Sequence, residues 1–278
     1  LDGGLQLFGE VVGIDGKLDH LFAVHRLEGF RAAAVVLRLG NGAGDDMMTL
    51  TKYGIREWGV GLVAAVVLLA GCCWLGAAGH PGWGAGVGVV VVVLFLALAA
   101  FFRNPSRRLP EDPRQLASPA DGVVRDIGEV EDFNFPPFNG RAVRIGIFLS
   151  VLNVHVNRTP AELEVESKYY REGEFLDARH PECAVRNEAM TIAGTAKAGD
   201  VRFPLAIRQI SGKIARKIVC PVDPGRTLRR GEVYGMIKFG SRTELYLPVD
   251  RFDIKVGIGD KVRGGETVVA AIRQESAK

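Results

Sequence analysis

A glycine–serine pair, Gly240-Ser241, separates two short strand-like segments near the end of the chain. The surrounding sequence is GMIKFGSRTELYLP, residues 235–248, in which Leu245 and Leu247 alternate with polar residues after the pair. Glycine tolerates backbone angles that other residues avoid, and it lets other groups approach its carbonyl closely. The Ser241 hydroxyl therefore stands beside an accessible peptide carbonyl, which permits attack on the bond before the serine. The ordinary alternative is a turn between strands.

Two further motifs each contain one residue suited to proton chemistry, a histidine in one and an aspartate in the other. His155 lies in FLSVLNVHVNRTP, residues 148–160, and Asp121 lies in SPADG, residues 118–122. Histidine titrates near neutrality and so suits proton transfer near pH 7. The ordinary alternatives are a core histidine satisfied within a strand and an aspartate that caps its own turn.

Asn157 and Arg158 follow the histidine in the same motif. Arginine binds carboxylate and phosphate groups through two parallel hydrogen bonds. We therefore predict that this pair contacts a carboxylate or phosphate of the substrate. A salt bridge on the protein surface is the alternative for the arginine.

These motifs, in this order along the chain, resemble those of the phosphatidylserine decarboxylase proenzymes in their short prokaryotic form, which has a K-F-G-S-R core at its processing site. The similar stretches run from about residue 53 to residue 271 and include RQISGKIARKIVC at 208–220. Longer bacterial relatives have two histidines three residues apart, whereas this chain has His155 at the first place and Arg158 at the second. The resemblance therefore leaves open whether His155 serves self-cleavage, decarboxylation or both.

The resemblance implies a pyruvoyl-dependent enzyme that processes itself. The Ser241 hydroxyl attacks the Gly240 carbonyl, assisted by His155 and Asp121, and elimination releases the upstream β chain. Residues 241–278 become an α chain headed by a pyruvoyl group derived from Ser241. That ketone forms a Schiff base with the substrate amine and accepts the electrons of the breaking carboxylate bond. The implied reaction converts phosphatidylserine into phosphatidylethanolamine and CO2, and it uses neither a metal nor pyridoxal phosphate.

Two uncharged segments, residues 58–79 and 82–102, predict a transmembrane helical hairpin. Each has about 20 residues, enough for a helix to cross a hydrocarbon core of roughly 30 Å. Basic residues flank the outer ends, at Lys52, Arg56, Arg103, Arg107 and Arg108. The positive-inside rule then places both ends, and everything that follows, on the cytoplasmic side of the cell membrane. A buried pair of core helices in a soluble protein is the alternative.

The fold class is predicted as mainly β, anchored by that hairpin. We expect residues 1–46 to be a non-native or mis-assigned extension, 47–102 the membrane hairpin, 103–115 a basic linker and 116–278 one barrel-like catalytic domain. Strand patterns occur at 122–130, 141–150, 162–168, 201–210, 214–220, 233–239, 243–247 and 266–272. Residues 257–270 look like the hairpin of biotinyl and lipoyl barrels, without the carrier lysine.

The composition argues against several other classes. The chain has 35 basic and 32 acidic residues, so it lacks the excess of positive charge that is typical of nucleic-acid-binding proteins. Its four cysteines do not have the spacing of a zinc site or a disulfide framework. The implied partners are phosphatidylserine in the membrane and the α and β chains of one proenzyme, while a homo-oligomer is left open. Two other functions remain as alternatives. One is a membrane-tethered Ser/Lys peptidase with Ser241 as nucleophile and Lys238 as base, and the other is a non-catalytic barrel adaptor.

Overall fold

The computed structural model describes residues 48–180, 182–213, 217–238 and 241–273. Its helical elements are η1 (Lys52–Gly54), α2 (Ile55–Ala77), α3 (Pro81–Phe101) and α4 (Cys183–Arg186). Its strands are β1 (Met48–Leu50), β2 (Arg103–Pro105), β3 (Gln115–Ala117), β4 (Gly122–Val130), β5 (Ala142–Leu149), β6 (Val156–Arg158), β7 (Glu162–Arg171), β8 (Ala189–Ala198), β9 (Val201–Ile210), β10 (Lys217–Val219), β11 (Thr227–Leu228), β12 (Val233–Lys238), β13 (Ser241–Pro248), β14 (Phe252–Ile254), β15 (Lys261–Val262) and β16 (Val268–Ile272).

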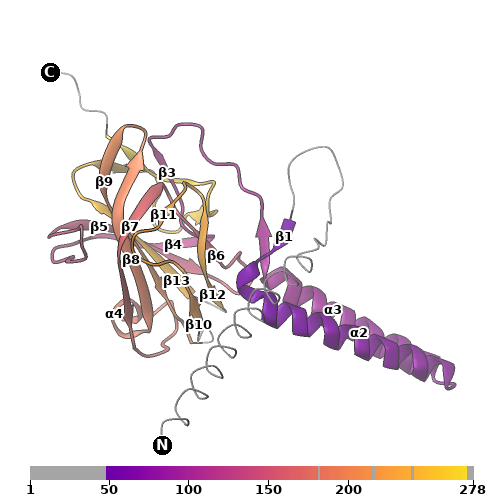
Figure 1. Cartoon of the computed structure of the whole chain (residues 1–278). Coiled ribbons are helices and arrows are strands. Elements are labelled where there is room, and N and C mark those ends of the chain that lie inside the picture. Colours follow the sequence, from indigo (N-terminus) through magenta and orange to yellow (C-terminus); the bar gives the residue numbers. More distant parts are fainter. Residues whose placement is uncertain (1–47, 181, 214–216, 239–240, 274–278) are drawn as a thin grey trace, which may run out of the picture. The chain divides into compact units, whose positions relative to one another are not determined.

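Helices α2 and α3 form an antiparallel pair joined by a short turn (Figure 1). A side chain at Gly84 would come within 2.5 Å of the Cys72 carbonyl oxygen, so glycine permits the close approach of the two backbones. Both helices are long and apolar enough to cross a membrane, and large apolar side chains such as Val67 and Leu94 are exposed along them. The predicted helical hairpin is therefore confirmed as a pair of helices, while the extension predicted for 1–46 lies outside the described residues.

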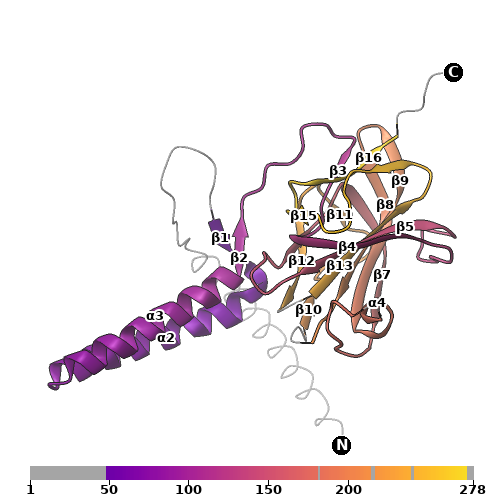
Figure 2. The same cartoon turned by 180° about the vertical axis from the view of Figure 1, so that it is seen from behind.

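The β domain is built on an eight-stranded antiparallel sheet in the order β11-β7-β8-β9-β13-β5-β4-β15. Figures 1 and 2 show this sheet curling around its core. Strands β10, β12 and β6 form a second sheet, and β14, β16 and β3 a third. Because β13 lies between β9 and β5, the segment after the predicted cleavage site is a central strand of the large sheet.

Hydrophobic alternation explains which face of β13 turns to the core. Leu245 and Leu247 are fully buried in the main hydrophobic cluster, together with Ile145 and Ile147 of the neighbouring β5. Side chains alternate between the two faces of a strand, so Tyr246, between these leucines, points to the opposite face together with Glu244. On that face Tyr246 stacks on the Phe133 ring, with 4.0 Å between the ring centroids.

The mainly β class is confirmed, and every predicted strand segment contains an observed strand. Strand β8 was not predicted, because its sequence AMTIAGTAKA is rich in small residues of low strand propensity. Its pairing with β7 and β9 stabilises it as a strand. The lipoyl-like hairpin at 257–270 differs from expectation, because β15 pairs with β4 whereas β16 pairs with β14 and β3.

Candidate active site

Ser241 lies where the chain passes from one sheet to another. Strand β12 belongs to the three-stranded sheet and ends at Lys238, while β13 begins at Ser241 in the large sheet and pairs there with Leu149 of β5. Gly240, the other half of the predicted cleavage site, lies outside the described residues. Ser241 is completely buried, and its hydroxyl has no hydrogen-bond partner among the described residues. A buried hydroxyl without a partner is costly in a folded protein, and a catalytic role is one explanation for keeping it.

His155 lies at the end of the loop between β5 and β6, next to β12. Asn153 closes the start of this loop by accepting hydrogen bonds from the Ser150 amide at 2.8 Å and the Ser150 hydroxyl at 2.7 Å. The backbone carbonyl of His155 then accepts a hydrogen bond from the Ile237 N–H of β12, at 3.2 Å. The histidine therefore lies beside the strand that leads to Ser241.

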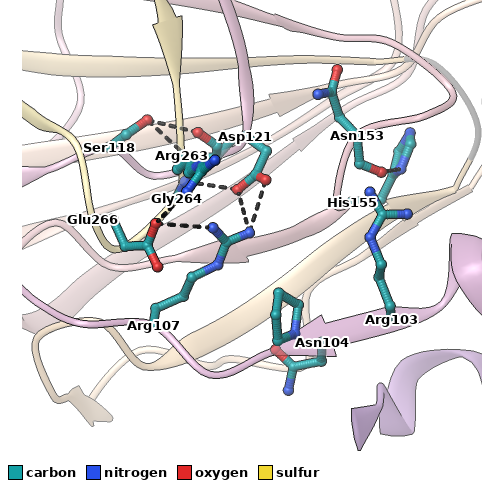
Figure 3. Close-up of polar contacts among 12 residues, drawn as sticks. Arg103, Asn104, Arg107, Ser118, Asp121, Asn153, His155, Arg263, Gly264 and Glu266 are labelled. Carbon is teal, nitrogen blue, oxygen red and sulfur yellow. Dashed lines mark hydrogen bonds and ion pairs between the residues drawn. The ribbon is translucent and has the colours of Figure 1, made fainter. Parts of the chain in front are cut away.

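The surroundings of His155 set its proton chemistry. Its Nδ1 lies 2.9 Å from the Asn153 carbonyl oxygen, which can only accept, so in the neutral ring Nδ1–H donates and Nε2 keeps its lone pair (Figure 3). The side chain is completely buried. Burial lowers the pKa of His155 from 6.5 to about 4, against the opposing effect of the Asn153 carbonyl and with a smaller lowering by the positive charge of Arg103. The imidazole is therefore neutral at physiological pH and able to take a proton.

Asp121 has other partners in this structure. Its carboxylate binds Arg107 at 2.8 and 3.0 Å and accepts a hydrogen bond from the Gly264 N–H at 2.8 Å. Figure 3 shows the carboxylate turned toward Arg107, while His155 lies beside Asn153. The structure thus places His155 beside β12, the strand that leads to Ser241, but does not pair Asp121 with the histidine. The orienting function predicted for Asp121 stays a prediction.

Backbone packing explains why a glycine follows Asp121. A side chain at Gly122 would lie 2.2 Å from the Phe148 carbonyl oxygen of β5. Only glycine lets β4 begin this close to its neighbour. The SPADG motif therefore places Asp121 at the start of β4, next to the strand from which the loop to His155 departs.

Asn157 and Arg158 both bind protein groups. Asn157 donates to the Thr243 hydroxyl at 2.9 Å and accepts from the Gln209 amide at 2.8 Å, and all three residues are fully buried. Arg158 donates to Asn104 at 2.6 Å and to the carbonyls of Pro105 and Gly231. Asn157 therefore connects β6 to the first residues of β13, and Arg158 connects β6 to Asn104 and Pro105 of the linker. Their predicted contacts with substrate stay predictions.

Sequence reasoning missed three features of this region. Arg107 was assigned to the linker, yet its side chain is only 9% exposed and pairs with Asp121 and Glu266. Thr243 and Gln209 were not noticed, although their polar side chains within strand patterns were a usable signal. The third is the ion pair between Lys238 and Glu57, whose Nζ and Oε1 atoms lie 2.5 Å apart. This pair occupies the amine that a Ser/Lys peptidase would use as its base, and so counts against that alternative.

Two cavities lined by described residues lie away from Ser241. One, of about 660 Å³, is lined by residues that include Arg114, Phe252 and Arg273. The other, of about 560 Å³, is also lined by Phe252 and Arg273. Both lie near the end of β13 that is opposite to Ser241. Within the described part of the chain, no cluster of His, Cys, Asp and Glu side chains could hold a metal ion. The candidate site therefore rests on the junction around Ser241 and His155.

Removing the Arg107 guanidinium should reveal what it contributes to this region. In Arg107→Gln, Asp121 keeps a nearly buried charge without its cation, so we expect the free energy of unfolding to fall by about 2–4 kcal/mol. The measurement is chemical denaturation in detergent of chains that also carry Ser241→Ala, so that cleavage does not intervene. Arg186→Gln, which breaks only exposed pairs with Glu174 and Glu182, is the control and should change stability by less than about 0.5 kcal/mol. An equal effect of both substitutions would contradict the expectation.

Known proteins resemble this chain over the same region. The sequence profile of the phosphatidylserine decarboxylase family matches residues 94–270. A phosphatidylserine decarboxylase proenzyme from Carboxydothermus hydrogenoformans is 46% identical over 182 residues, covering 64% of this chain and 81% of the relative. Proenzymes of the same name from Geotalea daltonii and Rhodopirellula baltica are 43% and 46% identical, covering 61% and 64% of this chain and 76% and 72% of those relatives.

Proposed function

The chain belongs to the phosphatidylserine decarboxylase family, and from this premise we propose that it converts phosphatidylserine into phosphatidylethanolamine and CO2. It is a carboxy-lyase made as a proenzyme. The single observation that carries the site assignment is the buried Ser241 hydroxyl, without a hydrogen-bond partner among the described residues, at a junction that also holds His155.

We propose that Ser241 begins the self-cleavage. Its oxygen bonds to the Gly240 carbonyl carbon, the C–N bond breaks, and the amide becomes an ester with a free serine amine. His155 takes the hydroxyl proton through Nε2, since Nδ1–H is held by the Asn153 carbonyl. Elimination across Ser241 then leaves Gly240 as a carboxylate. Hydrolysis of the resulting dehydroalanine consumes one water and releases one ammonia, which leaves a pyruvoyl group on residues 241–278.

The surroundings of Ser241 fit this group. Ser241 is buried at the start of the central strand β13, so bulk water is excluded from its hydroxyl. Within the described chain, the hydroxyl makes no hydrogen bond that would have to break before it attacks. Once formed, a pyruvoyl ketone supplies an electron sink for the bond between Cα and the carboxylate of an amino acid. The buried neutral imidazole of His155 is suited to moving the associated protons, so one residue could serve both self-cleavage and decarboxylation.

For Asp121, the proposed role requires a change of hydrogen-bond partner. The carboxylate is held by Arg107 and the Gly264 N–H in the uncleaved chain. It can orient His155 only after exchanging the arginine for the imidazole. We therefore propose that Asp121 stabilises the start of β4 in the proenzyme and acts on the histidine only when the Arg107 pair opens.

We further propose that α2 and α3 anchor the protein in the cell membrane, with the β domain on the cytoplasmic side. The support is the length and apolar character of both helices and the arginines that follow α3. A phospholipid substrate stays in the bilayer, so an anchored enzyme meets it by lateral diffusion. Arg103 lies two residues after the end of α3 and beside the loop that carries His155, which supports a site close to the membrane surface.

The intact mass of the purified protein under denaturing conditions tests the proposal first. We expect two fragments divided between Gly240 and Ser241, whose masses sum to that of the precursor plus one water minus one ammonia. The same preparation should release CO2 from phosphatidylserine in mixed micelles. A single intact chain from a membrane-containing host, or a smaller fragment that begins with free serine, would overturn it. The first result would favour the adaptor and the second the peptidase.

A further inference from the structure

The residues at the membrane-proximal end of the helical pair contact both halves of the candidate site. We call Lys52–Trp58 and Leu98–Arg103 the hairpin base. We infer that the hairpin base is part of the self-processing site and that Glu57 is a positioning residue, which holds Lys238 and thereby the segment that leads to Ser241. This inference rests on the proposed function, because it concerns the same cleavage.

The first set of contacts fixes β12. Glu57 pairs with Lys238, the last residue of the strand, and the Lys238 side chain is only 8% exposed. Tyr53 donates a hydrogen bond to the Val233 carbonyl at the other end of β12, at 3.2 Å. Between them, Met236 is fully buried in a cluster with Phe102 and other residues of the hairpin base. Strand β12 is therefore held along its length by residues from the hairpin base.

The second set of contacts fixes the loop that carries His155. The Phe101 ring lies against the imidazole, with 4.4 Å between the ring centroids and 37° between the planes. Arg103 donates to the Leu152 carbonyl at 2.6 Å and to the Ala100 carbonyl at 2.6 Å, so it joins this loop to the last turn of α3. The base of one helical pair thus binds both chain segments that meet at the site.

Close packing makes the hairpin base a rigid body. Phe102 is fully buried, and a side chain at Gly54 would lie 2.0 Å from its ring. The Trp58 indole and the Phe102 backbone are both bonded to Thr51, at 3.1 and 2.8 Å. Packed interfaces of this kind do not deform gradually, so a displacement of the helices is transmitted to what they hold.

Lys238 and Ser241 are close along the chain. Only residues 239 and 240 separate the two strands, and each residue spans at most about 3.5 Å, so the covalent chain keeps Lys238 and Ser241 within roughly 10 Å of each other. We therefore expect a shift of Lys238 to displace the bond that Ser241 must attack. Misplacement of reacting atoms by about 1 Å can slow a reaction on the order of a hundredfold. Because the ion pair is partly exposed at Glu57, we expect a smaller effect, about tenfold, when it is lost.

The experiment follows self-cleavage in time after cell-free synthesis into lipid nanodiscs, by the fraction of chain separated into two fragments. We expect Glu57→Gln to slow cleavage about tenfold. The charge-reversed pair Glu57→Lys with Lys238→Glu should recover most of the rate, since it restores the attraction with opposite polarity. Glu174→Gln, at an exposed ion pair with Arg186, is the matched control and should cleave like the unmodified chain.

The outcomes separate this inference from the proposed function. If the unmodified chain does not cleave, the proposed function fails. If it cleaves and Glu57→Gln cleaves equally fast, the positioning inference fails alone. A slow Glu57→Gln that the charge-reversed pair does not rescue also overturns it. A last check compares the melting temperatures of Ser241→Ala chains with and without Glu57→Gln. Closely similar melting temperatures support a positioning role for Glu57. A fall large enough to unfold the variant at the assay temperature overturns that role.

Discussion

We expect Ser241→Ala to leave the protein as one uncleaved chain that releases no measurable CO2 from phosphatidylserine. Without the hydroxyl no ester can form, so the upstream chain is not released and the electron sink is never made. We expect a loss of activity of at least about 10⁴-fold, because a residue that is both nucleophile and precursor of the reactive group cannot be replaced by its neighbours. Gel electrophoresis and release of labelled CO2 measure the two effects.

Ser211→Ala is the matched control for this substitution. Ser211 is also fully buried, and its hydroxyl likewise has no hydrogen-bond partner among the described residues. It follows Ile210, which pairs with Arg242, so it lies across the sheet from Ser241, but it is not part of the bond that is cleaved. We therefore expect the Ser211→Ala chain to be cleaved and active. An active, uncleaved Ser241→Ala chain would refute the proposed function. If cleavage and activity fell equally in both variants, the loss would come from removing a buried hydroxyl in general and not from the reactivity of Ser241.

His155→Gln slows self-cleavage by about 10²–10⁴-fold, the usual contribution of a positioned general base. Glutamine can keep the hydrogen bond to the Asn153 carbonyl, but it cannot take a proton from Ser241. The measurement is again the time course of fragment formation. Cleavage at the normal rate would contradict the assignment of His155 as the base.

The pH dependence gives a second test of His155. Burial lowers the pKa of His155 to about 4, so the neutral ring persists well below neutrality. We expect the cleavage rate to stay constant from pH 8 to about pH 5 and to fall as the pH approaches 4. A fall with its midpoint near 6.5 would mean that the working histidine is exposed to water.

The same shift makes folding stability depend on pH. The unfolded chain binds a proton at His155 near pH 6.5, and the folded chain does so only near pH 4. Folding is therefore undisturbed by this group above pH 6.5 and loses stability as the pH falls from 6.5 toward 4, by about 3 kcal/mol in total. Denaturation of the Ser241→Ala chain at several pH values measures the loss. Adding His155→Gln should remove this part of the pH dependence.

Local patterns in the sequence determined a large part of this picture. Runs of uncharged residues predicted α2 and α3, because helix length and side-chain polarity are properties of a continuous segment. Alternation of apolar residues predicted strands such as β4 and β13, because a strand with a buried face repeats every two residues. The Gly-Ser pair and the motifs around Asp121 and His155 were likewise visible as short stretches of chain.

Only the tertiary structure decided which of these stretches meet. Strands β12 and β13 are neighbours in sequence but enter different sheets, so Ser241 lies at a crossing between sheets and not at the tip of a hairpin. Lys238 and Glu57 are 181 positions apart, and their ion pair depends on how β12 packs against the hairpin base. Asp121 binds Arg107, although the family resemblance implied a histidine partner. Periodicity states which face of an element is buried, whereas the partner across that face depends on the sheet order and on packing between distant segments.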